Sequence, residues 1–152
     1  MLKLDTTIAS VIVRKDGADE ENLTANGVRI PLFRKSTEYI WSGAANLDSN
    51  FHLISAAPYL FLEPLGELVE AASVVIEWSI TVLRNKYKNT HVGRSVLQIT
   101  DNLPTQHKLI DVLPDQLNCG DVIVITAKRV GSDVEDTAPL DMQGLGLFIA
   151  SN

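Results

Sequence analysis

The feature that most constrains the fold of this chain is the regular alternation of apolar and polar residues between Ser73 and Arg84. A period of two residues is that of a β-strand, because successive side chains point to opposite faces of a sheet. The apolar face holds Val74, Ile76, Trp78, Ile80 and Val82. The middle of the other face is polar, so we expect a strand of an antiparallel sheet with one buried and one solvated side. Trp78 is predicted to lie in the core.

Short apolar and β-branched runs separated by turn-forming residues follow each other along the rest of the chain. Pairs such as Asp16-Gly17 and Asn26-Gly27 suit tight hairpin turns, because glycine adopts positive φ angles without a steric penalty. Further strands are predicted at residues 7–13, 28–34, 39–41, 51–54, 59–63, 92–100, 108–113, 121–129 and 140–150. This succession predicts an all-β sandwich or barrel.

Two regions differ from this pattern. The apolar residues of segment 65–72 are spaced as on a helix, but Gly66 weakens a helix, so we expect either a short helix or a loop there. Residues 1–50 contain an acidic tract at 16–22, expected to be an exposed loop. They form either an arm that contacts a partner or neighbouring subunit, or the first strands of the sandwich. Residues 51–152 form the sandwich, within one compact domain overall.

Composition excludes several classes of function. The 152 residues carry a net charge of −6, so the basic surface that nucleic-acid binding requires is missing, and the basic cluster 84–88 is expected to be a solvated loop. The apolar runs are shorter than the roughly 18 to 20 residues that cross a bilayer. The start of the chain lacks the pattern of a signal peptide. We expect a protein made in the cytoplasm that binds neither nucleic acid nor membrane.

Residues capable of catalysis or metal binding are scattered. Cys119 is the only cysteine, and His52, His91 and His107 lie in separate segments without a histidine partner at metal-binding spacing. The chain contains no phosphate-binding glycine-rich loop and no nucleophile motif. We therefore expect no catalytic residue, no cofactor and no histidine-bound metal.

A second type of metal site is conceivable in the loop that contains Asp133, Glu135 and Asp136. Calcium prefers oxygen ligands, and three carboxylates within four residues could supply some of them, although the spacing is not that of an EF-hand. The favoured alternative is a solvated or hydrogen-bonded loop. In that case Asp133 and Asp136 hold the backbone through Asx-type turns.

Several aromatic residues are candidates for a contact surface: Tyr39, Trp41, Tyr59, Phe61 and Tyr87. They could form a platform on which sugar rings stack. Packing between sheets or across a subunit contact is the favoured interpretation.

The last third of the chain resembles the closing strands of jelly-roll domains in tailed-phage virion proteins. The resemblance is carried by Gly120-Asp121, the alternating run after it, Arg129-x-Gly131-x-Asp133, Asp136-Thr137 and Leu145-Gly146-Leu147. The run from Ser73 to Thr81 with Trp78 is similar to a central strand of the same domains. Phe51 to Asn152 is the part covered. The resemblance implies an antiparallel jelly-roll-like β-sandwich of about eight strands.

Such virion proteins include capsid decoration proteins, head fibres and tail-fibre tips. The resemblance implies a non-enzymatic homotrimer on the virion surface that binds the major capsid protein and stabilises the capsid. Candidate partner-binding residues are Leu2, Leu4, Ile8, Tyr39, Trp41 and Tyr59. The alternative is a receptor- or carbohydrate-binding tip domain of a tail fibre, and a small sugar-active enzyme is a third, less favoured hypothesis.

Overall fold

The computed structural model describes residues 5–7, 10–15, 23–25, 28–30, 32–36, 39–47, 49 and 51–151. All regular secondary structure in these residues is β, arranged in two five-stranded antiparallel sheets and one short hairpin. The predicted all-β, jelly-roll-like antiparallel sandwich is thus confirmed. Within the same residues, no helix has the length and apolarity to cross a membrane.

The first sheet is built around β7 (Ala56–Pro64) and β12 (Met142–Ser151), which pair along almost their whole lengths. β10 (Thr105–Lys108) pairs with the other side of β7. The other side of β12 pairs with β1 (Asp5–Thr7) and, further along, with β5 (Leu32–Phe33). Strands from both ends of the chain therefore share one sheet.

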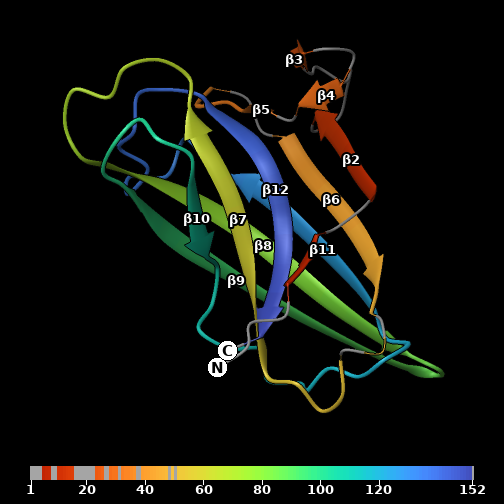
Figure 1. Ribbon diagram of the computed structural model, residues 1–152. Helices are drawn as coiled ribbons and strands as arrows, with labels where there is room; N and C mark the ends of the chain where they lie inside the picture. Colours follow the sequence, from red (N-terminus) through yellow and green to blue (C-terminus); the bar gives the residue numbers. More distant parts are fainter. Residues whose placement is uncertain are drawn as a thin grey trace.

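The second sheet has the strand order β2–β6–β11–β8–β9. These strands are β2 (Ser10–Lys15), β6 (Tyr39–Asn46), β11 (Val122–Arg129), β8 (Ala72–Arg84) and β9 (Tyr87–Ile99). Figure 1 shows this sheet as one layer and β7, β10 and β12 as the layer in front of it. β8 and β9 form a long hairpin, and β9 is an edge strand of the sheet.

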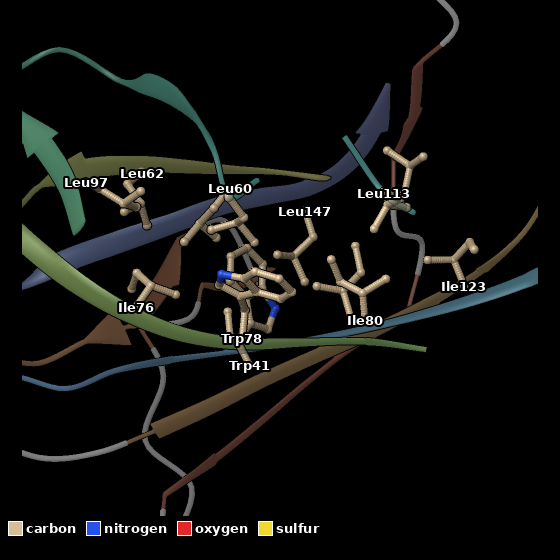
Figure 2. Close-up of a cluster of buried hydrophobic side chains, with 14 of the residues drawn as sticks. Trp41, Leu60, Leu62, Ile76, Trp78, Ile80, Leu97, Leu113, Ile123 and Leu147 are labelled. Atoms are coloured by element: carbon tan, nitrogen blue, oxygen red, sulfur yellow. The ribbon is translucent and has the colours of Figure 1, made fainter. Parts of the chain in front are cut away.

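The core lies between the two layers and follows the period of two residues. Along β8 the side chains at even positions from Val74 to Val82 are buried, and Trp78 is 8% exposed, which confirms its predicted place in the core. Figure 2 shows Trp41 and Trp78 side by side, with Leu60 and Leu147 of the facing sheet close to them. Burial of large apolar side chains on both inner faces stabilises the sandwich.

Four predicted strands are divided or misplaced. The strand predicted at 7–13 is divided between β1 and β2, and the one at 28–34 between β4 (Val28–Ile30) and β5; the two parts belong to different sheets in each case. Residues 51–54 form no strand, and Ile54 makes only a single bridge to Leu117. The strand predicted at 108–113 begins and ends earlier, as β10. After it the chain is irregular, and the amides of Leu109 and Leu113 donate hydrogen bonds to carbonyls at the start of β7. A short apolar run can be buried as a covering segment as well as a strand.

Segments 65–72 and 84–88 each contain a residue with a positive φ angle. Segment 65–72 is a loop rather than a helix until β8 begins, and Gly66 has a φ of 118°. The basic cluster 84–88 is the end of the β8–β9 hairpin; residues 85–88 are exposed, as predicted for a solvated loop, and Asn85 in the turn has a φ of 50°.

A smaller hairpin joins β3 (Leu23–Ala25) to β4 (Val28–Ile30). The predicted turns at residues 16–17 and 26–27 lie outside the described residues, as does the acidic tract 16–22.

Candidate binding face

The outer surface of the second sheet is hollowed across β6, β11, β8 and β9. The hollow has a volume of about 490 Å³. We call it the outer hollow, and its outward-facing side chains are Ile40, Glu77, Ser79, Val92, Arg94, Thr126 and Lys128. Glu77 and Ser79 belong to the solvated face that the alternation of the sequence predicts. The others share that face because residues opposite each other in a ladder point to the same side.

The strand register arranges these side chains in two rows. In the first row Glu77 stands opposite Lys128 of β11 and opposite Arg94 of β9. The second row, two residues along each strand, consists of Thr126, Ser79 and Val92. Neighbouring strands are about 4.8 Å apart, so hydrogen-bonding groups recur at that interval across the sheet. The outer hollow is therefore a shallow grid of hydroxyl and charged groups with aliphatic side chains at its margins.

The charged groups of the first row are paired. Lys128 Nζ lies 3.4 Å from a carboxylate oxygen of Glu77. Arg94 donates to both carboxylate oxygens of Asp133, at 3.0 and 3.2 Å, and to Glu135 at 3.1 Å. These hydrogen bonds raise the pKa of Arg94. The Glu135 backbone amide, together with Arg94, lowers the pKa of the Asp133 carboxyl.

Asp133 and Glu135 belong to the loop of residues 130–141, which we call the acidic loop. A buried ion pair holds the base of this loop in place. Arg129 Nη2 lies 2.8 Å from Asp136 Oδ1, and the two side chains are 1% and 0% exposed. Lys35 Nζ lies 2.9 Å from the same oxygen. Arg129 also donates to the carbonyls of Phe33, Ala138 and Leu140. Five hydrogen bonds from one buried side chain fix the base of the loop in place.

Asp136 is held ionised by this environment. Burial alone raises the pKa of its carboxyl, but hydrogen bonds from Arg129, Lys35 and the Val75 amide outweigh burial and leave the pKa below its usual range. Removing water from a carboxylate is costly unless donors replace it, and here they do.

The acidic loop contains Asp133, Glu135 and Asp136, the three carboxylates that the sequence offers as candidate calcium ligands. In the structure each of these carboxylates is paired with an arginine, and Asp136 with Lys35 in addition. Within the described part of the chain, no group of three histidine, cysteine, aspartate or glutamate residues could hold a metal ion. The Asx-type turn is present at Asp133, whose Oδ1 accepts the Glu135 amide at 2.9 Å. Asp136 instead accepts the amide of Val75.

The predicted partner-binding residues do not come together in one place. Leu2, Leu4 and Ile8 lie outside the described residues, and Tyr39 begins β6 without a described side chain. The prediction that Trp41 contacts a partner is wrong. Trp41 is 3% exposed and packs on Phe33 in the core, so its ring is not available to a partner. Its position on β6 is an inward one, which a run as short as 39–41 could not reveal.

Tyr59 belongs to an aromatic group on the outer side of the first sheet. Together with Phe61 and Phe148 it forms what we call the aromatic strip, whose members are partly exposed. The rings of Phe61 and Phe148 are 6.3 Å apart, and Lys108 Nζ lies 5.8 Å from the Tyr59 ring centre. A Cβ atom on Gly146 would lie 2.7 Å from the Phe148 ring, so this glycine gives the ring its space.

The histidines and Cys119 lie apart from both surfaces. His91 Nε2 is 2.9 Å from Asp115, and this hydrogen bond contributes most to a lowered pKa of Asp115. Burial lowers the pKa of His107. Cys119 is exposed in the turn before β11.

Sequence reasoning missed most of the outer hollow. Arg94, Thr126 and Lys128 belong to predicted strands, but they were not recognised as site residues. Their polar positions in alternating runs were a usable signal. That these positions face Glu77 and Ser79 depends on the pairing of β8 with β9 and β11, which alternation alone does not specify.

No protein-family model matches the chain, and no curated protein matches it. Among solved structures, it is similar to the CBM22-1–GH10 modules of endo-1,4-β-D-xylanase 10B from Clostridium thermocellum, complexed with xylohexaose. That likeness has 13% identity and a TM-score of 0.42, and covers 99% of this chain but 26% of the other. The chain thus spans about a quarter of that protein's length.

A second similar structure is TmCBM61 in complex with β-1,4-galactotriose, with 7% identity and a TM-score of 0.39. It is covered to 91%, and this chain to 96%. Neither is a phage protein. Of the virion resemblance, the strand arrangement of this chain confirms the antiparallel β-sandwich. These likenesses carry no argument about a ligand, and only the geometry of the outer hollow and the aromatic strip bears on function.

Proposed function

We propose that this chain is a non-catalytic binding domain that takes a carbohydrate chain into the outer hollow. The observation that carries the proposal is the pair of rows on β11, β8 and β9, in which hydroxyl and charged groups lie on one open, shallow surface. A surface of this shape admits an extended ligand from solvent without a change in the backbone.

The chemistry of the outer hollow suits sugar hydroxyl groups, which donate and accept hydrogen bonds at once. Ser79 and Thr126 carry hydroxyls that bond to each other and can also bond to a ligand. Glu77 offers acceptors, and Lys128 offers donors. Val92 is 76% exposed and provides an apolar surface for the C–H face of a sugar ring. Alternate polar and apolar contacts are what recognition of a pyranose requires.

The same lining supports binding rather than turnover. Glycoside hydrolysis uses two carboxyl groups on either side of the scissile bond. Among the described residues that line the outer hollow, Glu77 is the single carboxylate, and it is paired with Lys128.

The test is affinity electrophoresis or calorimetry with a panel of soluble polysaccharides. The double variant Ser79→Ala/Thr126→Val removes both hydroxyls of the outer hollow. Because these two hydroxyls bond to each other, removing them together leaves no unpaired hydroxyl behind. We expect a loss of about tenfold in affinity, since two hydrogen bonds of ordinary strength are removed. Thr81→Val/Thr90→Val is the matched control, because these hydroxyls bond to each other at 2.9 Å next to the hollow without lining it. A wild-type chain that bound no polysaccharide would refute the proposal.

A second candidate function is attachment to a larger particle, and the aromatic strip is the observation that favours it. Aromatic side chains are enriched in protein interfaces, where they bury a large area. In this role the chain would be a capsid decoration protein, a homotrimer on the virion surface that docks on the major capsid protein.

This alternative makes its own prediction. The chain should bind expanded empty capsids in many copies per particle, and Phe148→Ser should abolish attachment while Ser79→Ala/Thr126→Val leaves it intact. Native mass spectrometry would measure the trimer. Failure of the wild-type chain to co-sediment with capsids would remove this candidate.

A further inference from the structure

We propose that the outer hollow selects neutral glycans and rejects glycans that carry carboxylates, and that the acidic loop enforces this choice by occupying Arg94. The inference rests on the proposed function and names the ligand class of the same site.

The first ground is the charge around the outer hollow. Its two cations, Arg94 and Lys128, are accompanied by three carboxylates, those of Glu77, Asp133 and Glu135. The local balance is therefore one negative charge in excess. A sugar acid that entered the hollow would meet net repulsion, whereas a neutral sugar would meet a dense set of donors and acceptors.

The second ground is the state of Arg94. A guanidinium group binds a carboxylate through two parallel N–H donors, and this is the usual way in which a protein reads an acidic ligand. In this chain Arg94 Nε and Nη2 are already directed to Asp133, and Nη2 also reaches Glu135. An acidic sugar would have to displace two carboxylates to obtain the same geometry.

The third ground is that the acidic loop cannot easily move aside. Its base is held by the buried pair of Arg129 and Asp136, and its tip by the bond from the Glu135 amide to Asp133. At its far end the Ser73 carbonyl accepts the amides of Thr137 and Ala138. The carboxylates facing Arg94 thus stand on a loop fixed at three points, and Arg94 remains occupied.

The experiment compares neutral oligosaccharides with uronic-acid oligosaccharides of equal length by calorimetry. The test variant is Asp133→Asn/Glu135→Gln, in which the side-chain amide oxygen introduced at position 133 can still accept the backbone amide of residue 135. The control variant is Glu70→Gln/Asp111→Asn, which makes the same change in net charge at exposed residues that do not line the hollow. We expect the wild type and the control to bind only neutral glycans.

The test variant should gain affinity for uronic-acid oligosaccharides by about fivefold or more, since Arg94 is released, and added salt should reverse the gain. Its affinity for neutral glycans should stay within about twofold of the wild type. If the wild type binds both classes equally and the test variant changes neither, the inference is overturned while the proposed function stands. If the wild type binds uronic-acid oligosaccharides but no neutral one, the inference is likewise overturned. Binding to neither class would refute the proposed function itself.

Discussion

Among single residues, Asp136 has the largest predicted effect on stability. Its carboxylate is fully buried and accepts hydrogen bonds from Arg129, Lys35 and the Val75 amide. In Asp136→Asn the guanidinium of Arg129 remains buried without a counter-charge. We expect a loss of about 3 kcal/mol in the free energy of unfolding. Urea denaturation measures it, with Glu70→Gln as the control at an exposed site.

The same residue sets a dependence of stability on pH. The pKa of Asp136 is lower in the folded chain than its unfolded value of about 3.9. The stabilisation is therefore present in full above that unfolded value and is lost as the pH falls through the folded pKa. We expect the urea concentration at the midpoint of unfolding to decrease when the pH is lowered below about 4. Asp136→Asn should flatten this part of the profile, and an unchanged slope would contradict the assignment.

At the scale of an element, the hairpin of β8 and β9 depends on a close approach between two residues that face each other. A Cβ atom on Gly93 would lie 2.2 Å from Cζ2 of Trp78, so only glycine fits over this indole. Gly93→Ala should cost about 1 to 3 kcal/mol by overpacking.

A double-mutant cycle tests this contact. In Trp78→Phe the clashing part of the ring is absent, so Gly93→Ala should cost clearly less in that background. Gln98→Ala, at an exposed position of the same strand, is the control. Equal costs in both backgrounds would show that the clash is not the cause.

Elements were predictable where one face is buried and the other solvated. β8 is evident in the sequence because its alternation is long, and β11 because an apolar, β-branched run, Val122 to Ile125, follows a turn. β12 is evident as a strand, but the place of Phe148 is not. Its pairing with β7 shifts between Gly144 and Gly146, and an irregularity of this kind reverses the faces that alternation would assign. The aromatic strip could therefore not be seen complete in the sequence.

For the whole molecule, the order of strands predicts slow folding. Apart from the β3–β4 and β8–β9 hairpins, the strand pairings join segments distant in sequence, as when β12 pairs with β1 and β11 pairs with β6. Loops of that length must close before the contacts form, so we expect refolding on the millisecond-to-second timescale. Stopped-flow fluorescence can follow it, since Trp41 and Trp78 are both buried. Refolding within microseconds would contradict the strand order.

The two-layer architecture could be predicted from the sequence, but the layout of the layers and the binding face could not. Alternation gives each strand an inner and an outer side without naming its neighbours. The pairs that build the outer hollow, such as Glu77 with Lys128, and the buried pair of Arg129 with Asp136 arise only once neighbours are assigned. The acidic loop, predicted to be solvated, therefore contains one carboxylate, that of Asp136, which is buried and holds the base of the loop in place.

The pairing of β1 with β12 sets Asp5 opposite Ala150. Joining these two points with a short linker would leave both layers intact, and the chain could then be opened elsewhere, for example within residues 65–71. A circular permutant of this kind, or a copy spliced into a surface turn of an unrelated carrier, should keep its outer face free. The pairing of β1 with β12 thus allows the domain to be inserted into another protein with the outer hollow and the aromatic strip both left exposed.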